Sequence, residues 1–372
     1  MATPSPDLDV TLDEVLLSHL PAGGTVVKAH KLGLSDWCDT TRYDVETSPD
    51  GEIARFFEKR AFGDNGAELT AAHWHSESSI YKFIPEYIPR PIATGSYKSN
   101  PDAYFILMDF EDMIDDDIPD PKAYMAAPAA LQLRSLGHSP TGKFGLPVTT
   151  RFANLKQQND WESSWEVWWT NHTKFILERE EKIRGPHGEQ DAKLKEDYVS
   201  KVLPRYLRPL ESGGRTLEPA LCHTDLWPGN VKYRLDNVSS LVFDANALWA
   251  HSELELGLFR NPRYPLGKAY IEEYLKTVPI SEPEEDFDSR NIMYMIRHQV
   301  CLASVYPNEA KLRDIFLANM RILVNRVNAE ENENVEVDVT AVAEKLKTLD
   351  VDSGSKNTVS VAVAEKPTVL ET

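Results

Sequence analysis

The sequence predicts an α+β protein of two lobes, a small N-terminal lobe with a sheet and one helix and a larger, mostly helical C-terminal lobe. Two observations predict this. Between residues 25 and 110, short β-type runs dominate and one helical stretch interrupts them. From residue 111 to 330, after an acidic joint, helical patterns dominate. They are broken at 221–244 by a loop and two short apolar runs.

In the small lobe, residues 40–45 and 53–57 are two β-type runs separated by a Ser-Pro-Asp-Gly turn at 48–51. Two such runs joined through Pro-Asp-Gly predict a β-hairpin. Residues 68–83 then predict a helix, which has to end before Pro85.

Residues 88–92 predict an extended segment, because a residue that precedes proline avoids the α region. The apolar run 104–108 predicts a buried strand. We expect the hinge between the lobes to follow this strand, near Phe110.

In the large lobe, the clearest predicted helix covers residues 161–181, and a second covers 191–207 with a kink at Pro204. Helices resume at about residue 267. Beyond residue 330 the chain is polar and acidic, which predicts disorder. The predicted divisions are an arm at 1–20, the small lobe at 21–110, the large lobe at 111–330 and a tail at 331–372.

Composition excludes several classes of protein. The 372 residues contain no apolar run of about 18 residues, which excludes a transmembrane helix. The first residues lack the pattern of a signal peptide, and three widely spaced cysteines cannot form a disulfide framework. We therefore expect a cytoplasmic protein; the sequence leaves its oligomeric state open.

The net charge of −19 argues against nucleic acid and anionic membranes as partners, since both would repel the protein. Most of this charge lies in residues 111–120, 281–288 and 330–372, so the rest of the chain is nearly neutral. The charge therefore does not argue against a nucleotide as partner.

The segment that carries chemistry begins at His223-Thr224-Asp225. Asn230 follows Asp225 by five residues, and Asp244 comes after a further apolar run. A His-x-Asp-x4-Asn loop followed by an Asp is the kinase arrangement for phosphoryl transfer, which needs a carboxylate at the acceptor hydroxyl and oxygen ligands for Mg²⁺. A turn at 235–237 would let the flanking residues pair as a hairpin and bring Asp244 back toward Asn230. The alternative is a capped turn and an unrelated surface acid.

These residues also resemble a known family. The runs 223–230, 243–245 and 251–257 resemble the fructosamine-3-kinase (ketosamine-3-kinase) family, in particular its fungal members. That family belongs to the aminoglycoside-phosphotransferase-like branch of the protein-kinase-like fold. Weaker matches occur in family order: Gly33-x-Ser35-x-Trp37 resembles the phosphate loop, and residues 56–59 resemble the strand that carries a lysine.

The resemblance implies a two-lobe protein-kinase-like fold and an ATP- and Mg²⁺-dependent kinase. Its acceptor would be a sugar hydroxyl of a ketosamine, free or attached to a protein lysine. By this resemblance Asp225 would be the base, and Asn230 and Asp244 would be the Mg²⁺ ligands. Lys59 would contact the ATP phosphates. Other residues expected around the nucleotide are Gly33, Ser35, His73, Glu77, Met108 and Phe110.

For the acceptor, the candidates are Trp227, inside the loop, and Trp161, which occupies a position that matches the family. His251 and Glu253 line the same pocket or brace the loop; the sequence leaves both alternatives open. The further tryptophans at 165, 168 and 169 have helical spacing, which is more typical of core packing.

The chain departs from the family pattern at two positions. Thr224 replaces a glycine, so the loop either does not need a positive φ or is remodelled. His73 replaces the glutamate that would pair with Lys59, and Glu77, one helical turn later, is the candidate substitute. The alternatives are therefore a kinase with another hydroxylated substrate, or a weakly active, nucleotide-binding scaffold.

Overall fold

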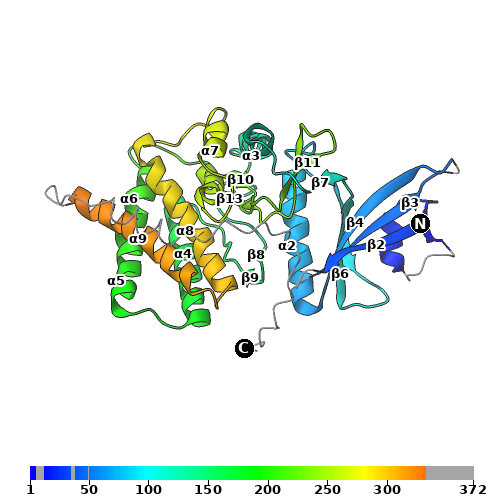
Figure 1. Ribbon diagram of the computed structural model, residues 1–372, viewed down its shortest axis with the longest axis horizontal. Coiled ribbons are helices and arrows are strands. Elements are labelled where there is room, and N and C mark those ends of the chain that lie inside the picture. Colours follow the sequence, from blue (N-terminus) through cyan, green and yellow to red (C-terminus); the bar gives the residue numbers. More distant parts are fainter. Residues whose placement is uncertain (6–11, 35–37, 49, 332–372) are drawn as a thin grey trace.

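The computed structural model describes residues 1–5, 12–34, 38–48 and 50–331 of the chain. A sheet lies at one end of the molecule and a group of long helices at the other (Figure 1). The predicted tail, apart from its first residue, lies outside the described residues. None of the described helices is long and apolar enough to span a membrane.

Within the described residues, six strands form the N-terminal sheet in the order β1-β2-β3-β4-β6-β5. The predicted hairpin is confirmed, since β3 pairs antiparallel with β4, although Pro49 of its turn lies outside the described residues. The predicted buried strand is also confirmed, because Phe105, Ile106 and Leu107 in β6 are fully buried. The strands are β1 (Thr3–Pro4), β2 (Thr25–Leu34), β3 (Asp39–Glu46), β4 (Ile53–Phe62), β5 (Pro91–Ser96) and β6 (Ala103–Asp109).

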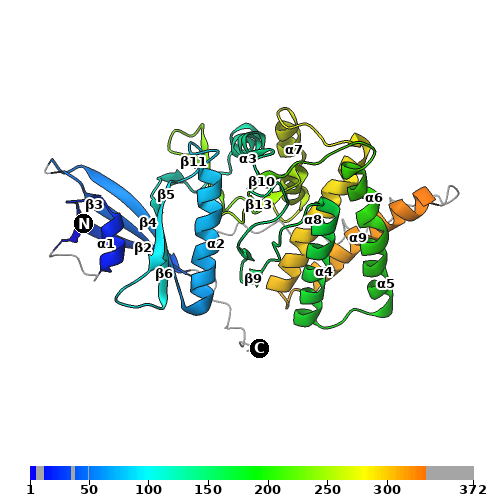
Figure 2. The ribbon, with the colours of Figure 1, turned by 180° about the vertical axis from the view of Figure 1, so that it is seen from behind.

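Two helices accompany this sheet: α1 (Glu14–His19), capped by the Asp13 carboxylate on Val15 N (2.9 Å), and α2 (Gly63–Tyr81). We call the sheet with α1 and α2 the small lobe. Helix α2 packs on β4, β5 and β6 and stands between the sheet and the rest of the molecule (Figures 1 and 2). It begins earlier than predicted because Gly63 turns the chain at φ 66° and Gly66 lets the helix approach Ala61 closely.

The remaining described residues form the large lobe, which is mostly helical as predicted. Its helices are α3 (Pro121–Ser135), α4 (Trp165–Arg184), α5 (Glu189–Asp197), α6 (Leu203–Leu207), α7 (Lys268–Leu275), α8 (Phe287–Val305) and α9 (Ala310–Glu331). Its short strands are β7 (Met113–Ile114), β8 (Arg151–Phe152), β9 (Leu155–Lys156), β10 (Ala220–Cys222), β11 (Val231–Arg234), β12 (Ser240–Val242) and β13 (Leu248–Ala250).

Two details differ from the prediction for the helices. Helix α4 starts at Trp165 rather than at Trp161, because Ser164 occupies the N-cap and the Glu211 carboxylate accepts Trp165 N at 2.9 Å. The predicted kink takes the form of a π-helical turn, Tyr198–Val202, between α5 and α6. Pro204, which lacks an N–H, follows directly at the start of α6.

The hydrophobic side chains form two separate clusters. One fills the small lobe around Val26, Val45 and Phe105, and the other fills the large lobe. Ile80, in the last turn of α2, belongs to the large-lobe cluster. Helix α2 is therefore anchored in both lobes, which places its middle turns at their boundary.

Candidate active site

The loop at residues 223–230 connects β10 to β11 and holds two of the predicted residues together. The Asn230 side-chain nitrogen donates to the Asp225 backbone oxygen at 2.9 Å and to its carboxylate Oδ2 at 3.2 Å. The Asn230 N–H donates to the Trp227 oxygen at 2.9 Å, which closes the loop as a turn. The five-residue spacing from Asp225 to Asn230 therefore brings the two side chains into direct contact.

The predicted hairpin is confirmed and returns Asp244 to this loop. Strands β11 and β12 pair antiparallel, with Val231 opposite Val242. Phe243 N donates to the Asn230 oxygen at 3.1 Å, and the Asn230 side-chain nitrogen lies 3.4 Å from the Asp244 oxygen. Asp225, Asn230 and Asp244 thus converge as the sequence predicted.

Thr224 takes the left-handed conformation, with φ 61°, so the loop does require a positive φ at this position. This is unfavourable for a β-branched residue, and surrounding contacts must hold it. Its N–H donates to Glu255 Oε1 at 2.8 Å, its hydroxyl donates to the Asn246 oxygen at 2.7 Å, and Glu255 Oε2 accepts His223 N at 2.6 Å. The buried Glu255 carboxylate therefore clamps the backbone of the loop.

We expect Thr224→Val to lower the free energy of unfolding by about 1–3 kcal/mol, because the half-buried Asn246 oxygen loses its donor while the backbone strain remains. Urea unfolding monitored by circular dichroism measures this. Thr224→Ser keeps the hydroxyl and should stay close to wild type. Equal destabilisation by both variants would show that the hydroxyl contact does not hold the loop.

Lys59 of β4 reaches this group of residues from the small lobe. Its Nζ lies 2.6 Å from Asp244 Oδ1, and the two side chains are 15% and 50% exposed. Burial disfavours the charge on Lys59, but Asp244, with further attraction from Cys38 and Glu77, raises the pKa of Lys59. Burial likewise opposes the charge on Asp244, yet Lys59 and His73 hold its pKa well below its ordinary value. Both groups are therefore charged at neutral pH.

The pKa of Asp225 is shifted in the opposite direction from that of Asp244. Burial, and then the negative charge of Asp244, raise the pKa of Asp225 to about 7. A carboxyl group with a pKa near neutrality is suited to accept a proton from a hydroxyl. Burial also raises the pKa of Glu255 to about 7, although it accepts two backbone N–H groups.

His73 and Glu77 of α2 both reach the site, but their contacts are with the turn after β12. Glu77 is fully buried and accepts Ala245 N at 2.9 Å. His73 Nε2 lies 3.1 Å from Glu77 Oε1 and 3.3 Å from Asp244 Oδ1. Among the described residues, Lys59 forms its ion pair with Asp244, and Glu77 adds only a longer-range attraction. Contrary to the prediction, Glu77 is therefore not the ion-pair partner of Lys59 among the described residues.

The other described residues that were predicted to contact the nucleotide lie in or next to strands of the N-terminal sheet. Gly33 pairs with Thr40 near the end of β2, and Ser35 lies outside the described residues. Met108 is buried in β6. Phe110 follows β6, its N–H donates to the Arg55 oxygen at 3.0 Å, and its ring lies under Arg42.

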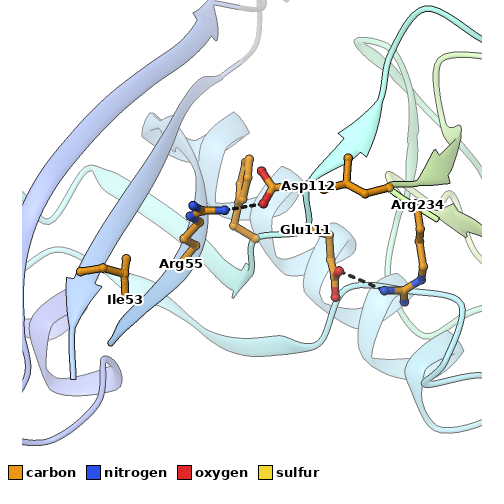
Figure 3. Close-up of a pocket in the computed structure, with 7 residues that line it drawn as sticks. Ile53, Arg55, Glu111, Asp112 and Arg234 are labelled. Atoms are coloured by element: carbon orange, nitrogen blue, oxygen red, sulfur yellow. Dashed lines mark hydrogen bonds and ion pairs between the residues drawn. The ribbon is translucent and has the colours of Figure 1, made fainter. Parts of the chain in front are cut away.

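An open depression of about 400 Å³ lies beside Phe110, after the end of β6 (Figure 3). Arg55 pairs across it with Asp112, and Arg234 pairs with Glu111 at 3.0 Å. Its lining consists of Ile53, Arg55, Phe110, Glu111, Asp112, Arg234 and Leu235. The depression is thus bounded by the start of β4, the segment after β6 and the β11–β12 turn, and Asp225, Asn230 and Asp244 do not line it.

The residues predicted for the acceptor divide into two groups. Trp227 lies within the loop and is 41% exposed, and its ring lies over Gly229, where a Cβ would approach the indole to 2.1 Å. Trp161 is only partly buried, at the edge of the large-lobe core. Both stay candidates for contact with an acceptor.

His251 and Glu253 are instead fully buried, which favours the bracing alternative. His251 contacts the hydroxyls of Tyr294 (2.6 Å) and Ser281 (2.8 Å), and Glu253 forms a buried ion pair with Arg290 (2.7 Å). The prediction that they line the pocket is therefore corrected: their polar atoms are occupied behind the loop. The tryptophans at 165, 168 and 169 are buried core residues, as their spacing indicated.

Sequence reasoning missed several residues around Asp225. Arg297 is buried in α8 and donates to His172 at 3.2 Å, and its positive charge offsets part of the rise in the pKa of Asp225. Tyr264 contacts Trp227 with ring centroids 6.4 Å apart, and its pKa is raised by burial and by Asp225. The available signal was Arg297 with His298 and Gln299, polar residues that interrupt the apolar residues of α8.

The chain is similar in sequence to proteins of a known family. A family model described as fructosamine kinase matches residues 55–312. Mouse ketosamine-3-kinase is 28% identical over 159 residues, which cover 42% of this chain and 46% of the mouse protein. The chloroplastic protein-ribulosamine 3-kinase of Arabidopsis thaliana is 24% identical over 156 residues, or 42% and 44% of the two chains. The matched segment thus spans less than half of either relative, and the predicted likeness to fungal members stays a prediction.

Solved structures establish the fold. A protein from Thermobifida fusca described as a fructosamine-3-kinase superposes with a TM-score of 0.63 at 20% identity, covering 85% of this chain and all of that one. An aminoglycoside phosphotransferase in complex with AMP-PNP and hygromycin B superposes with a TM-score of 0.57 at 12% identity, covering 86% and 99%. The predicted α+β, protein-kinase-like fold is confirmed.

Proposed function

Because the chain belongs to the fructosamine kinase family, we propose that it transfers the γ-phosphoryl group of ATP to a sugar hydroxyl of a ketosamine, free or protein-linked. The observation that carries this proposal is the convergence of Lys59, Asp225, Asn230 and Asp244. These residue types supply the parts that phosphoryl transfer needs: a cation for phosphate, a carboxylate for the hydroxyl, and oxygen ligands for Mg²⁺.

In the proposed mechanism, Asp225 accepts the proton of the attacking hydroxyl. The Asn230 side-chain nitrogen fixes the orientation of its carboxylate. Lys59, charged and only 15% exposed, binds phosphate oxygens and neutralises charge that develops during the transfer. To do so Lys59 would leave Asp244, and the Asp244 carboxylate would then be available to hold a metal ion.

The residues present fit a magnesium ion. Asp244 is ionised and half exposed, and the bonds of Asn230 to Asp225 and Asp244 use its amide nitrogen, which leaves the amide oxygen as a ligand atom. Mg²⁺ commonly takes one or two protein ligands and completes its shell with substrate phosphates and water. Bound there, the ion would neutralise phosphate charge.

The test is a panel of acceptors offered with Mg²⁺ and ATP, with ADP release measured by a coupled assay. Fructosyl-lysine and ribulosyl-lysine should stimulate ADP release, and hydroxylated amines without the keto-amine group, including aminoglycosides, should not. Stimulation by another hydroxylated amine alone would favour a kinase with a different acceptor. Nucleotide binding without transfer to any acceptor would favour the scaffold.

A prediction for the acceptor concerns Gly229 and Trp227. Gly229→Ala should push the exposed indole aside rather than unfold the protein, because the clash is with the outer edge of the Trp227 ring. We expect kcat/KM for the acceptor to fall about fivefold to tenfold, the value of one lost aromatic contact. Trp227→Ala should give a similar loss, and the double variant should be no worse than either.

Gly188→Ala is the matched control, since nothing lies within 4 Å of a Cβ at that position. Additive losses in the double variant would contradict the contact between Gly229 and Trp227 as the cause.

A further inference from the structure

Helix α2 holds the turn after β12 through three side chains on one face. Glu77 Oε1 accepts Ala245 N at 2.9 Å, and Ser76 Oγ accepts Ala247 N at 3.2 Å. His73 Nε2 approaches Asp244 Oδ1 at 3.3 Å. The helix therefore contacts both the carboxylate of Asp244 and the backbone that carries it.

The position of the histidine proton follows from its neighbours. His73 Nε2 lies between Glu77 Oε1 and Asp244 Oδ1, and a carboxylate oxygen that is ionised can only accept a hydrogen bond. Nε2 must therefore carry the proton and donate it. His73 thus bridges the side chain of Glu77 and the carboxylate of Asp244.

Asp244 needs such a restraint. It has φ 58°, the left-handed region that costs energy for residues other than glycine. Its side chain is half exposed, so packing alone does not fix it. The bond from Ala245 N to the buried Glu77 acts at the next peptide unit and maintains this conformation.

We propose that Glu77 and His73 are positioning residues for the metal-binding carboxylate. In kinase-like folds the equivalent helix usually contributes a glutamate that pairs with the phosphate-binding lysine. Here the side chains of α2 contact Asp244, the ion-pair partner of Lys59, rather than Lys59 itself. Helix α2 positions Asp244, and Asp244 in turn holds Lys59 until nucleotide binds. This inference rests on the proposed function, since it assigns Asp244 to Mg²⁺.

The experiment measures ADP affinity by titration calorimetry on the full chain, once with Mg²⁺ and once with EDTA. Loss of hydrogen bonds that orient a metal ligand costs about tenfold or more in metal affinity. We therefore expect Glu77→Ala to remove about tenfold of the affinity gained with Mg²⁺, while affinity in EDTA stays close to wild type. Glu77→Gln, which retains an acceptor for Ala245 N, should recover most of the loss.

His73→Leu should likewise lose part of the ADP affinity gained with Mg²⁺ and keep its affinity in EDTA. This variant replaces Glu77→Ala in the test if Glu77→Ala does not fold. The controls are His75→Leu, two residues along and therefore on another face of α2, and Asp64→Asn, an exposed acid in its first turn. Both should bind as wild type does.

Two results would overturn the inference. If Glu77 served Lys59 instead, its loss would weaken ADP binding in EDTA as strongly as with Mg²⁺. If it had only a structural role, the melting temperature would fall and the ratio of the two affinities would not change. A wild-type protein whose ADP binding does not respond to Mg²⁺ would instead refute the proposed function.

Discussion

Asp225→Asn is expected to abolish turnover while making the protein more stable. Removing a general base costs about a thousandfold in rate. Asparagine retains the shape of the side chain and its contact with Asn230, so ADP should still bind. Phosphoryl transfer under single-turnover conditions and ADP titration measure the two effects separately.

The gain in stability follows from the pKa of Asp225, which is about 7 in the folded protein and near 4 in the unfolded chain. Between these values the folded state binds the additional proton, so the free energy of unfolding falls as the pH rises, and the loss is complete above about pH 7. Asparagine has no charge to bury. At about pH 8 we expect a gain on the order of 2 kcal/mol, which should shrink toward about pH 4.

Asp116→Asn, which removes an exposed carboxylate of the acidic joint, is the matched control and should change neither turnover nor stability. Turnover by Asp225→Asn at a rate close to wild type would contradict the assignment of the base. A stability gain that does not depend on pH would contradict the electrostatic explanation.

Asp244→Asn is expected to have the opposite effect on stability. It should remove the response of ADP affinity to Mg²⁺ and abolish turnover, because the charged ligand is lost. It also leaves Lys59, 15% exposed, without its ion-pair partner. Since Asp244 is half exposed, solvent screening limits the cost, and we expect a loss of about 1 kcal/mol at neutral pH.

The pH dependence has the sign of a carboxyl group whose pKa is lowered by folding. Its contribution is present above the unfolded pKa of about 4 and is lost as the pH falls further, so wild type and variant should converge in acid. Adding Lys59→Met to Asp244→Asn removes both partners and should restore stability, which calorimetric unfolding can measure. A double variant less stable than Asp244→Asn would contradict the ion pair as the cause.

The loop at residues 223–230 could be predicted from the sequence because its geometry is local. Asp225 and Asn230 are five residues apart in one turn, and a short hairpin returns Asp244. The start of α2 could not be predicted, because Gly63 and Gly66 indicate a break when only propensity is considered. Tertiary contact with Ala61 makes the second glycine necessary.

Contacts between segments that are distant in the sequence could not be predicted from it. Nothing in the spacing of residues indicates that Glu255 clamps His223 and Thr224, or that Thr224 accepts a left-handed conformation because of it. The position of His73 suggested a missing partner for Lys59. Only the packing of α2 against the turn after β12 reveals that Asp244 is the partner and that α2 holds Asp244.

We propose that this site transfers phosphate to the sugar of a ketosamine with Asp225 as base. The most direct measurement is single-turnover reaction of enzyme, ATP, Mg²⁺ and fructosyl-lysine, followed by phosphorus NMR of the products. We predict a phosphate ester on the sugar with wild-type protein, and unreacted ATP with Asp225→Asn. Inorganic phosphate without a sugar ester would contradict the proposed reaction, and an ester formed equally by the Asp225→Asn variant would contradict Asp225 as the base.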